Sequence, residues 1–255
     1  MRLVPTAWLV GLAPAAALSP AGAQVSARWP IHSIDRPQPP IVAPAPTARP
    51  DAPPADAVVL FDGTDLSQWE ADSGPARWKV DSGFVEVAGG TGSIHTTRGF
   101  GDCQLHIEWM APTPPQGDGQ ERGNSGVYLM SEYEVQVLDS YNNPTYPDGQ
   151  AAAVYGQFPP LVNASRPPGV WQSYDIVFHR PRFSAKGKLQ QPARLTVLHN
   201  GVLVQDNVEL SGPTAHERRP PYAAHPDALP LLLQDHGDPV RYRNIWVRSL
   251  KEAPE

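Results

Sequence analysis

The sequence contains one cysteine, Cys103, in 255 residues, so no disulfide can form within the chain. Without cysteine pairs, and without two histidines at helical spacing, it also lacks the usual zinc-binding motifs. Cys103 stands one residue before an apolar alternating segment. We therefore expect a small buried hydrophobe at this position and not a nucleophile.

Charged side chains are also scarce, at 18% of the chain, and their balance is acidic. The formal net charge is −6 and the pI is about 5.7. A nucleic-acid partner would require a basic patch or stripe, so this balance argues against nucleic-acid binding.

Long apolar runs are missing except near the start, where residues 7–18 are mostly apolar but interrupted by a proline. This run is too short to cross a bilayer, so we expect no transmembrane span. Arg2 before the run and the small residues 21–23 after it fit an export signal. We expect a signal peptide over residues 1–23, cleavage after Ala23, and a periplasmic or secreted protein.

Proline is abundant, with 31 copies, and is densest in residues 24–57. Such density precludes a helix and most sheet pairing, which predicts an extended, polyproline-like segment. A simple spacer has little use for apolar side chains such as Trp29, Ile31 and Ile41. We therefore expect residues 29–42 to lie along the surface of the folded domain.

From residue 58 onward, short apolar runs rich in β-branched and aromatic residues alternate with turn signals, and no stretch has a convincing helical period. Asn200-Gly201 supplies the two positive φ angles of a tight hairpin turn. The pattern predicts an all-β, antiparallel jelly-roll β-sandwich over residues 58–251. The expected strands are Val58–Phe61, Phe84–Val87, Leu105–Met110, Ser125–Met130, Tyr133–Leu138, Ser173–His179, Ala193–Leu198, Val202–Val204, Leu231–Gln234 and Arg243–Leu250.

Three long connections interrupt these strands, at residues 111–123, 140–170 and 211–230. Structureless loops of this length are uncommon in compact domains and are usually functional. We expect them to form walls over one face of the sandwich and to bring side chains such as Tyr155 and His216 to it.

Two expected strands carry a carboxylate opposite an apolar face. One presents His106 and Glu108, and the other presents Glu134 and Gln136 and is followed by Asp139. Alternate side chains of a strand point to opposite faces, so these polar groups could gather on one sheet surface. Paired carboxylates in a cleft are acid and base candidates. The alternative is a strand face exposed to water.

A third apolar strand ends in Gln234 and His236, which the alternation places on the same side, and Arg243 opens the next strand. An arginine beside a histidine and a glutamine could stabilise an oxyanion. The alternative for Arg243 is a solvated surface ion pair.

Eight segments, in order along residues 58–250, resemble one known family. They are Leu60–Trp69, Gly99–Trp109, Asn124–Tyr128, Tyr133–Asp139, Trp171–Ile176, His199–Gly201, Leu233–Gly237 and Arg243–Ile245. The family was long called domain of unknown function 1080 and is described as 3-keto-glycoside lyase/hydratase or 3-keto-disaccharide hydrolase. The resemblance implies a concanavalin/laminin-G-like jelly roll and an exported protein.

The resemblance also implies a reaction, the net hydrolysis of 3-keto-glycosides. The C1 substituent leaves by β-elimination, and water then adds to the resulting 3-keto-2-hydroxy-glucal. The partner would be an oligosaccharide or glycoside that a separate dehydrogenase has oxidised at C3.

For this reaction we expect Glu134 to act as base or acid, with Glu108 or His236 as its partner. The expected substrate-binding residues are His106, Gln136, Asp139, Tyr155, Gln234 and Arg243. No residue spacing demands a cofactor. The alternative that a divalent metal takes part in the reaction stays open, because these side chains include suitable ligands.

Two other functions are consistent with the same residues. A non-catalytic carbohydrate-binding module would use the polar face with stacking aromatic rings. A conventional glycoside hydrolase would use two carboxylates on an unoxidised sugar.

Overall fold

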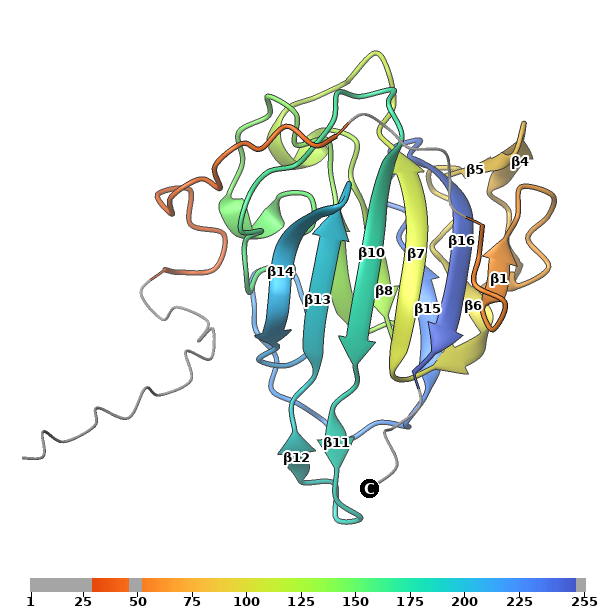
Figure 1. The fold of residues 1–255 in the computed structure, drawn as a ribbon, viewed down its shortest axis with the longest axis vertical. Helices are drawn as coiled ribbons and strands as arrows, with labels where there is room; N and C mark the ends of the chain where they lie inside the picture. Colours follow the sequence, from red (N-terminus) through yellow and green to blue (C-terminus); the bar gives the residue numbers. More distant parts are fainter. Residues whose placement is uncertain (1–28, 46–51, 251–255) are drawn as a thin grey trace, which may run out of the picture.

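The computed structural model describes residues 29–45 and 52–250, and it shows two antiparallel sheets packed face to face (Figure 1). The predicted all-β jelly-roll sandwich is confirmed. The expected signal peptide lies outside the described residues. Within the described residues, the only helices are two single 3₁₀ turns, neither of which could cross a membrane.

The larger sheet faces the viewer in Figure 1, and β1 pairs with β16 at its side. Its strands, in spatial order, are β14 (Val202–Glu209), β13 (Arg194–His199), β10 (Gln172–His179), β7 (Cys103–Met110), β16 (Arg241–Ser249), β5 (Phe84–Glu86) and β4 (Lys79–Asp81), with β1 at Val58–Phe61.

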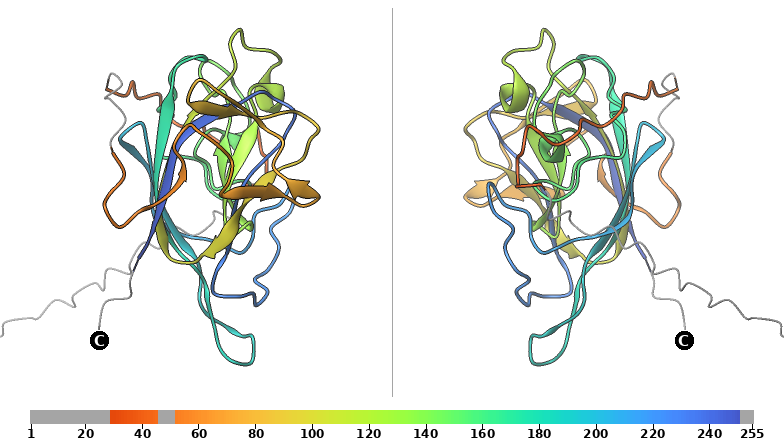
Figure 2. Two further views of the ribbon diagram at one scale, coloured as in Figure 1. Left: turned by 90° about the vertical axis from the view of Figure 1, so that its right-hand side faces the viewer. Right: turned by 90° about the vertical axis from the view of Figure 1, so that its left-hand side faces the viewer.

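The smaller sheet lies behind it, as the side views show (Figure 2). Its strands, in spatial order, are β3 (Gly74–Pro75), β2 (Trp69–Ala71), β6 (Ile94–Phe100), β15 (Leu229–Leu233), β8 (Ser125–Leu129) and β9 (Tyr133–Val137). The remaining elements are the hairpin of β11 (Arg182–Phe183) and β12 (Leu189–Gln191) and the 3₁₀ turns η1 (Gly119–Glu121) and η2 (Pro147–Gly149).

The core lies between the two sheets and is filled by alternate residues of each strand. Ile107 and Trp109 of β7 and Val135 of β9 are fully buried in it. The hydroxyl of Tyr174, on β10, crosses the core and donates to the carbonyl oxygen of Gln136 on β9, at 2.8 Å. The inner faces of β7 and β9 therefore face each other, which fixes where their other side chains point.

Each of the ten expected strands overlaps an observed one, and six short or polar strands are additional. The hairpin turn is as expected, with positive φ angles at Asn200 (55°) and Gly201 (78°). β6 was missed because its inward side chains include Thr96. Thr96 is buried through hydrogen bonds to the backbone of Arg98 and Leu231, and an apolar pattern does not reveal such burial.

The proline-rich residues 29–45, here called the strap, lie along the domain surface as expected. Ile41 forms a parallel bridge with Asn163, and the Gln38 amide donates to the carbonyl oxygen of Thr145, at 2.9 Å. In Figure 1 the strap, in red and orange, passes beside η2. The backbone donors and acceptors of this helix-free segment are thus partly satisfied by the loops that it crosses.

Candidate active site

The two predicted catalytic carboxylates lie on opposite faces of the sandwich. Glu108 alternates with core residues of β7 in the larger sheet, and Glu134 alternates with core residues of β9 in the smaller sheet. Because both strands turn their apolar side chains into one core, their polar side chains point away from each other. The expected pairing of Glu108 with Glu134 is wrong.

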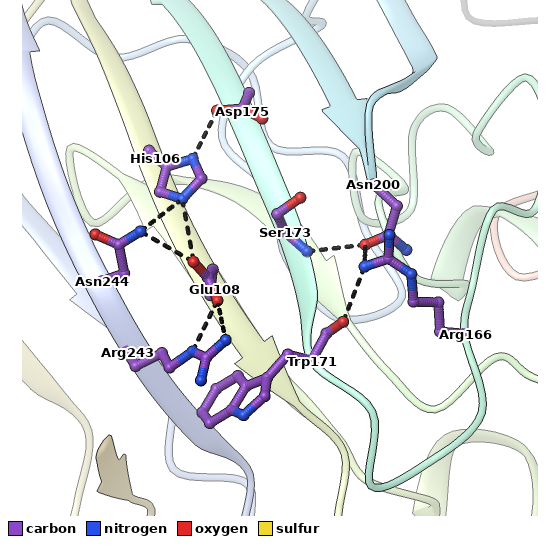
Figure 3. Close-up of polar contacts among 9 residues, drawn as sticks. All are labelled: His106, Glu108, Arg166, Trp171, Ser173, Asp175, Asn200, Arg243 and Asn244. Carbon is purple, nitrogen blue, oxygen red and sulfur yellow. Dashed lines mark hydrogen bonds and ion pairs between the residues drawn. The ribbon is translucent and has the colours of Figure 1, made fainter. Parts of the chain in front are cut away.

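Glu108 instead belongs to an ion-pair network on the outer face of the larger sheet (Figure 3). Its carboxylate accepts hydrogen bonds from Arg243, at 2.7 Å, and from Asn244, at 2.9 Å. His106 lies 3.8 Å from Glu108 and 2.7 Å from the carboxylate of Asp175. The Arg243 guanidinium also stacks over the Trp171 ring, 4.1 Å from its centroid.

The network holds Glu108 and His106 in their charged forms. Burial alone would raise the pKa of Glu108, but hydrogen bonds from His106, Asn244 and Arg243 outweigh it and lower the pKa to about 2. Burial alone would lower the pKa of His106, but Asp175 and Glu108 raise it to about 9. Glu108, His106 and Arg243 therefore belong to an ion-pair network on the face of the sandwich opposite Glu134, and the structure does not bring them together with Glu134 as expected.

A polar pocket of about 190 Å³ opens on the outer face of the smaller sheet. Five predicted site residues line it: Glu134, Gln136, Tyr155, Gln234 and His236. Asn124, Tyr128, Ala215 and His216 complete the lining.

Asp139 is the remaining expected binding residue, and it does not line the pocket. Its carboxylate pairs with Arg122, at 2.7 Å, and accepts the backbone N–H of Tyr141. It holds the loop that leaves β9, so its expected role in binding is corrected to a structural one.

Strand pairing explains how Glu134 and its neighbours meet. In the β8–β9 hairpin, Tyr128 lies opposite Glu134 and Gly126 lies opposite Gln136. The Glu134 carboxyl extends over Gly126, where a Cβ atom would come within 2.4 Å of Glu134 Oε1. Glycine at this position therefore leaves the space that the carboxyl occupies.

The long loop after β9 folds back to extend the smaller sheet. The Gln136 backbone N–H donates to the carbonyl oxygen of Ala153, at 3.0 Å, and Val154 bridges Val135. The Tyr155 N–H then donates to the carbonyl oxygen of Glu134, at 3.3 Å. This pairing places the Tyr155 side chain beside the Glu134 carboxyl.

Two hydrogen-bonded turns place the histidines. Asp235 accepts the backbone N–H groups of Gly92 and Gly237, both at 2.9 Å, and so fixes the turn that carries His236. Thr214 accepts the backbone N–H of Glu134, at 3.0 Å, and brings the following His216 to the opposite wall.

Glu134 is the one carboxylic acid among the described residues that line the pocket, and its pKa is strongly raised. Only 4% of its surface is exposed, and burial raises its pKa to about 8, against the opposing effect of a hydrogen bond from Tyr128. The Gln136 side-chain amide lies 2.9 Å from Glu134 Oε1, and it donates to that oxygen when its nitrogen faces the carboxyl. A carboxyl with a pKa near neutrality can both take and give a proton at working pH.

Among residues 29–45 and 52–250, no three His, Cys, Asp or Glu side chains converge as a metal-binding group.

No role was assigned to Asn124 or Tyr128 from the sequence, whereas His216 was expected on a loop that walls this face and does line the pocket. A signal was present for Tyr128, because it shares its strand face with Gly126 and the short turn before β9 predicts pairing with Glu134. The length of the loop after β14 was the signal for His216, which reaches the pocket on that loop.

The fold and the pocket define a jelly-roll β-sandwich with a small polar site that contains one buried, protonatable carboxyl. Residues 56–248 match the family described as 3-keto-alpha-glucoside-1,2-lyase-like domain. The chain belongs to this family.

Individual relatives agree with this assignment. A 3-keto-disaccharide hydrolase from Bacteroides thetaiotaomicron is 23% identical over 245 residues, covering 77% of this chain and 80% of its own length. A crystal structure from Parabacteroides distasonis, provisionally described as a glycosyl hydrolase, is 44% identical with a TM-score of 0.77, covering 84% of this chain and 93% of its own. Another such structure from that organism, 21% identical with a TM-score of 0.56, covers 76% and 99% and shares the fold.

Gly126→Ala should move the Glu134 carboxyl, because the added methyl group would overlap Oε1 and the Tyr128 ring. The displaced carboxyl gains contact with water, so its pKa should fall toward the ordinary glutamate value of 4.5. Carbon-13 NMR of the glutamate carboxyls across pH would detect the change, with Glu108→Gln as the control. A Glu134 titration still centred near 8 would contradict the proposed crowding.

Glu108→Gln should reduce the free energy of unfolding by about 2 kcal/mol near pH 6, because it leaves the partly buried donors of Arg243 and Asn244 without a charged acceptor. The Glu108 pKa is lowered on folding, so its contribution is present above pH 4.5 and is lost as pH falls toward 2. The deficit of the variant should shrink over that range. Urea unfolding at several pH values measures it, and a constant deficit would contradict this view of the network.

Proposed function

We propose that this protein is an enzyme that hydrolyses 3-keto-glycosides through elimination and rehydration. The observation that carries the proposal is the Glu134 carboxyl, buried in a polar pocket with a pKa near 8. Family membership and the hydrolase-type names of two relatives support the same reaction class.

The chemistry follows from the ketone at C3. It acidifies the C2 proton, because the electrons of the broken C2–H bond delocalise into an enolate. The enolate then forms the C1–C2 double bond as the C1–O bond breaks, and the leaving oxygen takes up a proton. Water adds back with its oxygen at C1 and a proton at C2, so the net change is hydrolysis. The route needs a proton acceptor at C2, a proton donor at the leaving oxygen and hydrogen-bond donors at the enolate oxygen.

The pocket provides a group for each requirement. Glu134 is the base or the acid, and His236 is its partner, the one remaining after Glu108 is assigned to the other face. Tyr155 and Gln234 offer an O–H and an N–H to sugar oxygens. Stabilisation of the enolate then comes from neutral donors, since Arg243 lies on the larger sheet.

The size of the pocket favours recognition of one sugar ring. Its volume of about 190 Å³ is below the roughly 300 Å³ at which sites for drug-sized ligands begin. The oxidised ring would occupy the pocket while the leaving group extends past the loops. This arrangement fits a substrate class defined by the 3-keto sugar more than by its aglycone.

The same geometry argues against a conventional glycoside hydrolase. That mechanism uses two carboxyl groups about 5–9.5 Å apart across the scissile bond. Glu134 is the one carboxylate among the described residues that line the pocket. A sugar-binding module remains the competing function, and the labelling experiment below separates it from an enzyme.

The proposed setting is the periplasm or the exterior, reached through the signal peptide expected at residues 1–23. A dehydrogenase that oxidises C3 of a glycoside would supply the substrate.

Glu134→Gln should abolish turnover of a 3-keto-disaccharide, because the amide can neither take nor supply the required proton. In deuterated water the wild type should place deuterium at C2 of the product, as NMR would detect, and should leave the unoxidised parent disaccharide unchanged. Product without deuterium at C2 would indicate direct displacement at C1. Binding without turnover by the wild type would identify a binding module.

The pH dependence should report the role of Glu134. If it is the base, kcat/KM rises with pH through about 8, and if it is the acid, kcat/KM falls above that pH.

The free energy of unfolding should also depend on the protonation of Glu134. Its pKa is raised on folding, so stability relative to Glu134→Gln should decline between pH 4.5 and about 8 and then level off. A constant difference in urea unfolding from pH 5 to 9 would show that Glu134 titrates normally.

A further inference from the structure

The strap reaches the pocket wall through the ring of His32. This ring stacks on Tyr146 with the centroids 4.1 Å apart and the planes at 18°. It also lies 5.0 Å from the ring of Tyr155 and 5.5 Å from that of His216, which both line the pocket. Residues from the strap, the loop after β9 and the loop after β14 thus meet around one imidazole.

A buried carboxylate fastens these three segments together. Asp148, in η2, is fully buried and accepts the backbone N–H of His32, at 3.2 Å. It lies 3.9 Å from the Arg36 guanidinium of the strap and 3.8 Å from the Arg219 guanidinium of the loop after β14. Charges paired away from water interact more strongly than exposed pairs, so this contact resists separation of the strap.

Close packing continues from this carboxylate to the pocket. Ile31 packs against Gly156. A Cβ atom added at Gly156 would lie 2.8 Å from the terminal methyl group of Ile31. Arg219 Nε donates to the carbonyl oxygen of Gly156, at 2.7 Å, and the hydroxyls of Tyr146 and Tyr155 are hydrogen-bonded at 3.0 Å. The strap therefore contacts Gly156, which follows Tyr155 in the chain, and Tyr146, whose hydroxyl is hydrogen-bonded to that of Tyr155.

The His32 ring acts here as a packing group. Burial lowers its pKa, an effect that Asp148 opposes and His216 reinforces, so the neutral ring predominates near neutral pH. Its Nε2 is buried and has no hydrogen-bond partner among the described residues. A phenyl ring could therefore replace the imidazole without loss of a hydrogen bond at that atom.

We propose that His32 is a positioning residue, and that the strap is part of the active site because it fixes Tyr155 and His216 in the pocket wall. The proposal builds on the proposed function, since it assigns a role in sugar binding to that wall. Side chains on a long loop must be held by neighbouring contacts before they can orient a substrate. For Tyr155 those contacts include the His32 ring of the strap and the Tyr146 side chain on which that ring stacks.

The test compares His32→Ala and His32→Phe with wild type in the full chain. His32→Ala should raise KM for a 3-keto-disaccharide about tenfold with a smaller change in kcat, because a loosened wall binds the sugar less well. A loss of folded protein would lower kcat alone. His32→Phe should restore most of the affinity, since it retains the stacking on Tyr146.

Hydrogen exchange measured by mass spectrometry provides a readout that does not need activity. Residues 146–157 and 214–219 should exchange faster in His32→Ala, while β10 stays protected. Ile34→Ala is the matched control, because Ile34 lies on the same strap and is 63% exposed.

Unchanged KM and unchanged exchange in His32→Ala would overturn the proposal, and so would faster exchange with an unchanged KM. If the wild type itself showed no turnover, the proposed function would fail, and the exchange of the two wall segments alone would decide whether His32 positions them.

Discussion

The structure depends on one constraint, the packing of alternate strand residues from two sheets into a single core. Once Ile107 of β7 and Val135 of β9 point inward, the side chains next to them must point outward in opposite directions. Two sets of polar residues that look equivalent in sequence therefore have different roles. The set on the larger sheet is neutralised by mutual ion pairs. The set on the smaller sheet is enclosed by loops and lines a pocket, where its members share hydrogen bonds with neutral partners.

The contrast between Glu108 and Glu134 is a contrast of surroundings. Both are nearly inaccessible to water, yet Glu108 is surrounded by cationic donors and Glu134 by neutral ones. The first carboxyl is held charged, whereas the second retains its proton up to about pH 8. In an elimination followed by a hydration, the C2 proton is removed and later returned. A carboxyl with this pKa suits both steps, so one carboxyl of this kind can serve where a conventional glycosidase needs two.

The sequence was informative wherever local periodicity decided the structure. It predicted the ten principal strands, the Asn200-Gly201 turn and the polar face around Glu134, because alternation and turn residues are local signals. It could not show which sheet each strand joins, since pairing depends on contacts distant in sequence. That gap caused the error over Glu108 and Arg243, which were placed in the pocket on strand pattern alone. His216 was expected only as part of a loop wall for a related reason, because a loop position carries no period that would assign it a more specific role.

The active site thus combines two kinds of support. Glu134, Gln136 and Tyr128 stand on paired strands, whose ladder hydrogen bonds and core packing fix their positions directly. Tyr155 and His216 stand on long loops, which must lose conformational freedom to hold a side chain in place. The Asp148 cluster and the His32 ring provide contacts that offset this cost, and they come from a segment whose prolines already restrict its backbone. A strap that is stiff before it docks loses little entropy in docking, which makes a proline-rich segment physically suited to bracing the wall of a loop-built pocket.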